Sequence, residues 1–216
     1  MAVRPVYMTY GEFPYIKIYQ TEFTWNGGFA PSQKQKNITA IHSVFNSHFP
    51  HLKVLEISSK SMQAGGADLS AFSLLKYVPS LGKGVPVENV FQAGKVFENA
   101  GPFVDLLTAS PRDAKQDERL RSSGSLIGFR FEETAFPTEP KTLFYDYIYT
   151  NALLENPDLA QIVLSYDAFT DIEFNPSKSI NCQAKAAALF VSLSSLGLQD
   201  SIKDYQTFRN LFERNN

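Results

Sequence analysis

Three polar side chains stand at helical spacing in the segment PVENVFQAGKVF, residues 86–97. Glu88, Gln92 and Lys95 occupy positions i, i+4 and i+7, and about 100° of rotation per residue brings them into one narrow stripe. A carboxylate, an amide and an ammonium group on one face can bind a polar substrate and exchange protons with it. The large ring of Phe91 beside the stripe indicates a pocket wall. The same spacing is typical of an ordinary amphipathic helix with a solvated Glu–Lys stripe, and that alternative stays open.

Signatures of several other chemistries are missing from the sequence. The glycines of LGKGVP, residues 81–86, lack the spacing of a phosphate-binding loop or a dinucleotide fingerprint. His48 and His51 have no second cysteine or acidic cluster at ligand spacing beside them. The nucleophile turn of serine hydrolases, G-x-S-x-G, does not occur. We therefore predict no metal site and no organic cofactor.

Local signals predict a mixed framework around the polar stripe. Alternation of apolar and polar residues favours strands over residues 15–25 and 52–58. Ser110-Pro111 followed by Asp113 is typical of a helix start, and Gly197 of a helix stop. Helices are expected over residues 87–97, 110–121, 144–155, 159–166, 179–197 and 200–216. Because strands and helices do not alternate regularly, we predict a single, predominantly helical α+β domain with a few short strands over residues 1–216.

Composition limits the size, compartment and partners of the protein. With 216 residues, 44% hydrophobic and 19% charged, the chain can bury one sizeable core and is not a disordered segment. A net charge of −2 gives no global field toward nucleic acid or an acidic membrane, so any such contact must be local. The single cysteine, Cys182, disfavours a secreted disulfide framework. No apolar run approaches the roughly 18 residues of a membrane span, and we expect a soluble, cytoplasmic protein without membrane contact.

Four sequence blocks resemble the NADAR family, the YbiA-like proteins. ENVFQAGKVF is similar to the signature helix of that family, in which a glutamate is followed by Phe-Gln-Ala and then a lysine. Residues 69–72 resemble its (L/F)-S-N-F segment, with Ala71 in place of the asparagine, and residues 110–115 its S-P-x-x-A-(K/R) helix start. Residues 171–181 resemble its acidic segment and G-K-x-N stretch. The resemblance spans about residues 52–195, with N-terminal strands and a C-terminal helix as additions.

Three longer blocks resemble one subgroup of this family, which occurs beside DarT-type DNA ADP-ribosyltransferase toxins. They are GFAPSQKQKNI (residues 28–38), LEISSKS (55–61) and KSINCQAKAAALFVSL (178–193). The chain departs from the family pattern after the signature lysine, where Val96 replaces an aromatic residue. It also lacks the family's Trp-Gly pair and carries Cys182-Gln183 in place of Leu-Gly.

The resemblance implies an ADP-ribosylglycohydrolase that acts as an antitoxin. Its reaction would hydrolyse the N-glycosidic bond between ADP-ribose and guanine in DNA, reversing a DarT-type toxin. The implied partners are ADP-ribosylated, single-stranded DNA, ADP-ribose as product, and the toxin itself. Two alternatives stay open: an N-glycosidase acting on small ribosylated metabolites of the riboflavin-pathway type, and a non-catalytic module that binds ADP-ribose.

Within this interpretation, Glu88 is the expected catalytic carboxylate, because cleavage develops positive charge at the ribose C1 and negative charge on the leaving base. A lysine amine could instead attack the ring-opened sugar as a Schiff base. We expect Lys36 in that role, with Lys34, Lys60 and Lys95 as competing candidates. The expected substrate-binding residues are Lys34, Lys60, Ser61, Ser70, Phe72, Phe91, Gln92, Lys95 and Asn181.

A basic stripe is expected to contact DNA. Arg112, Lys115 and Arg119 stand at i, i+3 and i+7 of the helix predicted over residues 110–121. Positive side chains in such a row can follow phosphates along a strand. A solvated, salt-bridged helix face is the alternative, and the sequence does not decide between the two.

Overall fold

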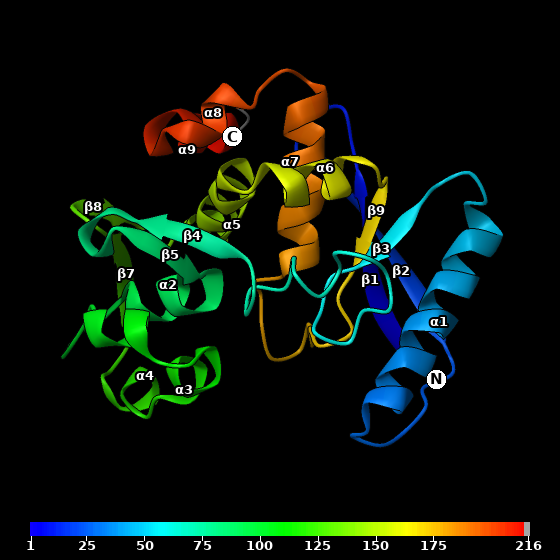
Figure 1. Ribbon diagram of the computed structural model, residues 1–216, viewed down its shortest axis with the longest axis horizontal. Helices are drawn as coiled ribbons and strands as arrows, with labels where there is room; N and C mark the ends of the chain where they lie inside the picture. The colour runs from blue at the N-terminus through cyan, green and yellow to red at the C-terminus, as the bar shows by residue number, and fades with distance from the viewer. Residues whose placement is uncertain (214–216) are drawn as a thin grey trace. The chain divides into compact units, whose positions relative to one another are not determined.

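The computed structural model describes residues 1–213 and divides into two compact units (Figure 1). Unit 1 comprises Met1–Ser70 and the chain from Pro157 onward, and unit 2 comprises Ala71–Asn156. Helices take up 42% of the described residues and strands 20%, so the prediction of a predominantly helical α+β fold is confirmed. That the whole chain forms a single domain stays a prediction.

Unit 1 is built on a four-stranded sheet with the strand order β2-β1-β9-β3. Its strands are β1 (Ala2–Thr9), β2 (Ile16–Phe23), β3 (Val54–Glu56) and β9 (Ala168–Thr170). The pairs β1–β2 and β1–β9 are antiparallel, and β3–β9 is parallel. Both strands predicted from alternation are therefore present, although β3 is shorter than the segment 52–58.

Helices cover the two faces of this sheet (Figure 1). On one face α1 (Pro31–His48) packs against β2, and its Ile38, Ile41 and Phe45 join the core. On the other face α7 (Gln183–Ser195) packs against β1 and β9. The predicted end of this helix at Gly197 is confirmed: α7 ends at Ser195, and Gly197 adopts a φ of 71°, a conformation that glycine tolerates best.

The remaining helices of unit 1 are α6 (Pro157–Leu164), α8 (Asp200–Lys203) and α9 (Tyr205–Glu213). The helix predicted over residues 200–216 is thus two helices separated at Asp204, and its last three residues lie outside the described chain. Phe208 of α9 is fully buried, and its ring centre lies 5.2 Å from that of Phe212.

Unit 2 surrounds the short helix α2 (Val87–Ala93). A hairpin of β4 (Leu75–Val78) and β5 (Lys83–Pro86), with the 3-10 turn η1 (Pro79–Leu81) between them, leads into α2. A three-stranded antiparallel sheet follows: β6 (Lys95–Phe97), β7 (Leu126–Phe131) and β8 (Thr134–Phe136). The other elements are η2 (Val104–Thr108), α3 (Pro111–Gln116), α4 (Arg119–Ser122) and α5 (Leu143–Glu155), of which α5 packs against α2 and β4.

Two predicted helices of unit 2 are wrong in extent. The helix predicted over residues 87–97 ends at Ala93, and Lys95 lies on strand β6, because the chain at Gly94 already accepts a hydrogen bond from the Arg130 N–H of β7 (2.7 Å). The helix predicted over residues 110–121 ends at Gln116, because Asp117 adopts an extended conformation (φ −54°, ψ 127°). Arg119 therefore does not share a helix with Arg112 and Lys115.

One helix in the first third of the chain was not predicted. Helix α1 fills 18 residues there, and strand β1 precedes it. The predicted strands over residues 15–25 and 52–58 thus flank a helix for which no prediction was made.

Candidate functional site

Helix α2 brings Glu88 into the interior of unit 2. All seven residues of the helix are buried, and Glu88 is only 6% exposed. No side chain caps the helix; instead the Val87 N–H donates to Leu74 O and the Glu88 N–H to Ala71 O, both at 2.9 Å. The carboxylate stands in the first turn of the helix, where the helix dipole favours a negative charge.

Two side chains contact the Glu88 carboxylate at the same oxygen. Gln92 Nε2 donates a hydrogen bond of 2.9 Å to Glu88 Oε1, and Lys115 Nζ lies 3.5 Å from that atom. Glu88 and Gln92 are each 6% exposed, so this part of the stripe lies in an enclosed environment and not on a solvated face. The alternative of a surface Glu–Lys stripe is therefore wrong for these two residues.

Gln92 also presents an acceptor that nothing in the described structure satisfies. Its Oε1 atom is buried and has no hydrogen-bond partner. An unsatisfied buried acceptor costs on the order of 1–3 kcal/mol. A hydroxyl or an N–H group of a ligand could donate to this oxygen and remove the cost.

Lys95 joins the same cluster from strand β6. Burial lowers the pKa of Lys95 to about 8; the charge of Glu88 opposes this shift and that of Lys115 adds to it. The ammonium lies 4.8 Å from the centre of the Phe91 ring. Near neutral pH a fraction of Lys95 is therefore uncharged and available as a base or nucleophile.

The aromatic residues play different parts in this cluster. Phe91 is only 8% exposed and packs its ring against Phe129, Phe144 and Tyr145; that it forms a pocket wall stays a prediction. Phe72 keeps a 36% exposed ring, with Lys115 Nζ 5.1 Å from its centre. We call Glu88, Gln92, Lys95, Lys115, Phe72 and Phe91 the Glu88 cluster.

Helix α3 delivers Lys115 to this cluster. The predicted start of the helix is confirmed: the Asp113 N–H donates to Ser110 Oγ (3.1 Å), and that hydroxyl donates to the Asp113 carboxylate (2.7 Å). Arg112, on the first turn, is exposed. The sequence predicts Lys115 as part of a DNA-binding row. Its contact with Glu88 was not predicted, because it depends on the packing of α3 against α2.

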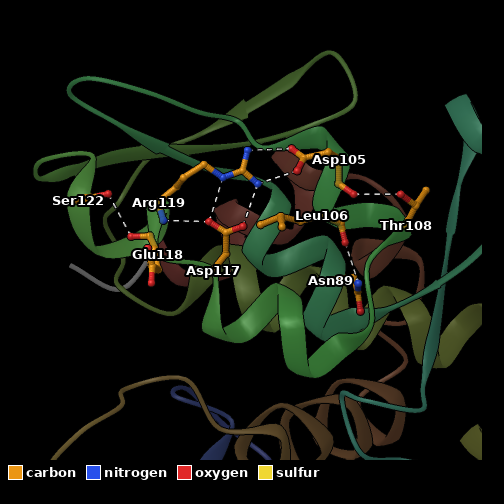
Figure 2. Close-up of polar contacts among 8 residues, drawn as sticks. All are labelled: Asn89, Asp105, Leu106, Thr108, Asp117, Glu118, Arg119 and Ser122. Carbon is orange, nitrogen blue, oxygen red and sulfur yellow. Dashed lines mark hydrogen bonds and ion pairs between the residues drawn. The ribbon is translucent and has the colours of Figure 1, made fainter.

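Arg119 contacts two carboxylates instead of pointing into solvent. Its guanidinium lies between Asp105 and Asp117 in Figure 2, with Nη2 2.6 Å from Asp105 Oδ2 and 2.9 Å from Asp117 Oδ2. The hydrogen bond from Arg119 lowers the pKa of Asp117. These contacts separate Arg119 from the basic row that its sequence position suggested.

The other predicted site residues belong to unit 1. The Lys34 side chain is 21% exposed. Its Nζ lies 3.4 Å from Glu173 Oε1 and 5.7 Å from the centre of the Trp25 ring. Lys36 is exposed. Lys60 Nζ donates to Ser59 Oγ at 2.7 Å.

Three further predicted residues of unit 1 are polar and at least partly buried. Ser61 Oγ accepts a hydrogen bond from the Gln63 N–H (3.2 Å), and Ser70 is 4% exposed. Asn181, just before α7, holds its Oδ1 buried without a partner. Like Gln92, it has an acceptor free for a ligand donor.

One buried acidic residue of unit 1, Glu56, was not predicted as a site residue. Glu56 is fully buried; its Oε2 accepts from the Thr170 hydroxyl (2.6 Å), and its Oε1 accepts from the Ile172 N–H (2.8 Å). His42 Nε2 lies 2.8 Å from the same hydroxyl. Burial raises the pKa of Glu56 and lowers that of His42 to about 4. No local sequence signal indicates that Glu56 is buried, because in LEISS (residues 55–59) it looks like an ordinary polar residue of an alternating strand.

Neither a cluster of metal ligands nor a membrane-spanning helix is found among the described residues. Across residues 1–213 no three His, Cys, Asp or Glu side chains gather in a way that could hold a metal ion. Over the same residues, no helix combines the length and apolar character needed to cross a bilayer.

Comparison with known proteins agrees with the resemblance of the sequence blocks. Residues 2–216 match the family described as DarT1-associated NADAR antitoxins, which extends the similarity beyond residues 52–195 to almost the full length. No curated protein matched the sequence. The chain therefore belongs to the family of DarT1-associated NADAR antitoxins.

Proposed function

We propose that the protein is an ADP-ribosylglycohydrolase that removes ADP-ribose from guanine in DNA and so reverses a DarT1-type toxin. The observation that carries this proposal is the buried Glu88 carboxylate, held by Gln92 at 2.9 Å and Lys115 at 3.5 Å. Membership in a family of antitoxins supports the biological role.

The Glu88 cluster has the groups that this hydrolysis needs. Water adds its oxygen to the ribose C1, the bond from C1 to the guanine nitrogen breaks, and a proton goes to that nitrogen. Glu88 stabilises the positive charge that develops at C1 and accepts a proton from the attacking water. The unpartnered Oε1 of Gln92 is free to accept a hydrogen bond from a ribose hydroxyl or a base N–H.

A lysine route remains part of the proposal. An uncharged amine can attack the ribose C1 and form a Schiff base on the ring-opened sugar, while the bond from C1 to guanine breaks and the guanine nitrogen takes a proton from the amine; water then hydrolyses the Schiff base to free ADP-ribose and the amine. Among Lys34, Lys36, Lys60 and Lys95, the last has a pKa lowered to about 8 and lies within the Glu88 cluster. Borohydride reduction during turnover, followed by peptide mass spectrometry, would attach ADP-ribose to the reacting lysine. If the attached ADP-ribose is recovered on Lys36, the lysine expected from the sequence is the reacting one.

DNA contact is proposed for the exposed start of α3. Arg112 is exposed there, whereas Arg119 is engaged by Asp105 and Asp117. If Arg112 contacts a phosphate, Arg112→Ala weakens binding of single-stranded DNA and lowers the slope of log K against log salt by about one. Binding with an unchanged slope would remove Arg112 from the interface.

The decisive experiment follows release of ADP-ribose from a single-stranded oligonucleotide that carries one ADP-ribosylated guanine. Wild-type protein should restore the unmodified oligonucleotide. Glu88→Gln should lower the single-turnover rate by about 10²–10⁴-fold, the usual contribution of a general acid or base. Glu133→Gln is the matched control, because Glu133 is an exposed carboxylate of the same unit.

Other outcomes would replace the proposal. Activity confined to small N-ribosides would favour a metabolite N-glycosidase. Toxin neutralisation that survives Glu88→Gln, with ADP-ribose still bound, would favour a non-catalytic module.

A further inference from the structure

The segment that carries Lys115 is closed into a loop by one arginine. Asp105 lies on η2 and Asp117 directly follows α3, and the Arg119 guanidinium bridges the two carboxylates (Figure 2). Nη1 and Nη2 donate to Asp105 at 3.3 and 2.6 Å, and Nε and Nη2 donate to Asp117 at 2.9 Å each. The guanidinium thus donates two hydrogen bonds to each carboxylate, the geometry in which arginine differs most from lysine.

The arginine is held in place by further contacts. Its guanidinium carbon lies 4.6 Å from the centre of the Phe103 ring, and its backbone N–H donates to Asp117 Oδ1 at 2.9 Å. Asp117 is only 19% exposed in its side chain, although Arg119 and Asp105 are 43% and 64% exposed. Solvent screens the Asp105 pair more than the Asp117 pair, so the bridge fixes geometry more than it adds stability.

A second anchor holds the middle of the same segment. Asn89, next to Glu88 on α2, is fully buried, and its Nδ2 donates to Leu106 O (2.7 Å) and Ala109 O (2.9 Å). Its contact with Leu106 is drawn in Figure 2. Ala114 of α3 is also fully buried, in a cluster with Ala93 of α2.

Lys115 depends on these anchors because its own helix is short. Helix α3 has six residues, and an isolated helix of that length is not stable in water. Lys115 is the penultimate residue of the helix, and Asp117 follows two positions later. Loss of the Arg119 bridge therefore frees the end of the helix at which Lys115 stands.

We propose that Arg119 is a positioning residue that holds Lys115 against Glu88 by bridging Asp105 and Asp117. This inference rests on the proposed hydrolase function for its kinetic test. Arg119 does not touch the substrate in this proposal; it acts through Lys115 alone.

A double-mutant cycle on single-turnover hydrolysis tests this dependence. Arg119→Ala should lower the rate about tenfold with substrate affinity changed less than threefold, since small misplacements in an active site act mainly on the chemical step. Lys115→Ala should have a similar effect. In the Lys115→Ala background, Arg119→Ala should cause no further loss.

Matched variants distinguish the bridge from charge alone. Arg119→Lys keeps the charge but cannot bridge two carboxylates in the same way, so it should behave nearly like Arg119→Ala. Arg121→Ala removes an equal charge from an exposed residue of α4 and should leave the rate unchanged. Full activity of Arg119→Lys, or an equal loss in Arg121→Ala, would overturn the proposal. The proposal would also be overturned if Arg119→Ala lowered the rate as much in the Lys115→Ala background as in wild type, because Arg119 would then have a general structural role.

A measurement without turnover separates this inference from the proposed function. Lys95 feels the charges of both Glu88 and Lys115, so displacement of Lys115 should raise the pKa of Lys95. Acetic anhydride labelling across pH 6 to 10, read by mass spectrometry, should show Lys95 reacting more slowly at pH 8 in Arg119→Ala than in wild type. An inactive wild-type protein would end the proposed function and leave this readout intact. An unchanged Lys95 profile in Arg119→Ala would end the positioning role.

Discussion

Lys115 Nζ lies 3.5 Å from Glu88 Oε1, and the two residues reach each other from separate helices, α3 and α2. The pair is asymmetric, because the glutamate side chain is 8% exposed and the lysine side chain 56%. Solvent screening of the lysine limits what the pair adds to stability. Its importance is therefore expected in the reaction and not in folding.

The first prediction separates these two effects. Lys115→Met should lower the free energy of unfolding by less than about 1 kcal/mol, as for other exposed ion pairs, and lower hydrolysis about tenfold. Urea unfolding and single-turnover assays on the same preparation measure both. Lys141→Met, at an exposed lysine of the same unit, is the control and should change neither. A stability loss above about 3 kcal/mol would mean that Lys115 is mainly a structural partner of a buried charge.

The second prediction concerns the pH dependence of stability. Burial lowers the pKa of Lys95 to about 8 from an ordinary value of 10.5. Between these values the unfolded chain binds more protons than the folded chain, so stability rises with pH across this window. Below pH 8 the folded state bears the full cost of the buried ammonium, up to about 3 kcal/mol.

Lys95→Met removes this cost. The variant should be more stable than wild type at pH 7 by about 1–3 kcal/mol, and the difference should shrink toward pH 10. Urea unfolding at several pH values measures the trend, with Lys83→Met as an exposed control. A difference that stays constant with pH would show that Lys95 titrates normally.

Signals carried by neighbouring residues were readable in the sequence. The Ser110-Pro111-Asp113 start of α3 and the Gly197 stop of α7 depend only on nearby backbone groups, and both are present. Helix α1 has local signals of the same kind, namely Pro31 and the spacing of Ile38, Ile41 and Phe45, but no helix was predicted from them.

Contacts between distant segments were not readable. Lys95 fits a helical period, yet it lies on a strand, because β7 pairs with the chain directly after α2. It still reaches the Glu88 cluster, so the residue was correctly chosen for an incorrect geometric reason. Arg119 does not belong to the predicted basic row, because its guanidinium binds the carboxylates of Asp117 and Asp105. Asp105 lies 14 positions earlier in the chain, so this contact could not be read from local sequence.

The third prediction tests the junction between α2 and β6. Gly94 has an ordinary helical conformation (φ −72°, ψ −11°), so the position needs space and not backbone freedom. A Cβ atom there would lie 2.7 Å from Arg130 O and 3.0 Å from Phe144 Cζ. Gly94→Ala should therefore destabilise the protein by about 1–3 kcal/mol through overpacking and displace Lys95.

Thermal unfolding and the hydrolysis assay measure this effect. Gly11→Ala is the control, because no heavy atom beyond its two chain neighbours lies within 4 Å of a Cβ at that position. The control should change stability by less than about 0.5 kcal/mol. If Gly94→Ala is as stable and active as Gly11→Ala, the close approach to β7 does not constrain the junction.

The fourth prediction concerns the hydrogen-bond chain of unit 1 from His42 through Thr170 to Glu56. The Thr170 hydroxyl donates its one proton to Glu56 Oε2 at 2.6 Å, so it must accept from His42 Nε2–H at 2.8 Å. Burial lowers the pKa of His42 to about 4, so at neutral pH the ring is uncharged and carries its proton on Nε2.

Glu56→Gln should reverse the direction of this chain. The Ile172 N–H, 2.8 Å from Oε1, requires the amide oxygen on its side and turns the new NH2 group toward Thr170. The hydroxyl must then donate to His42 Nε2, and the imidazole proton moves to Nδ1. Nitrogen-15 NMR of the imidazole ring should show the opposite tautomer in the variant, with the His48 signals unchanged. Because each donor keeps an acceptor, the stability loss should be smaller than for Glu56→Ala, which strands the Thr170 hydroxyl and the Ile172 N–H at about 1–3 kcal/mol each. The same His42 tautomer in wild type and variant would show that the carboxylate does not set the direction of the chain.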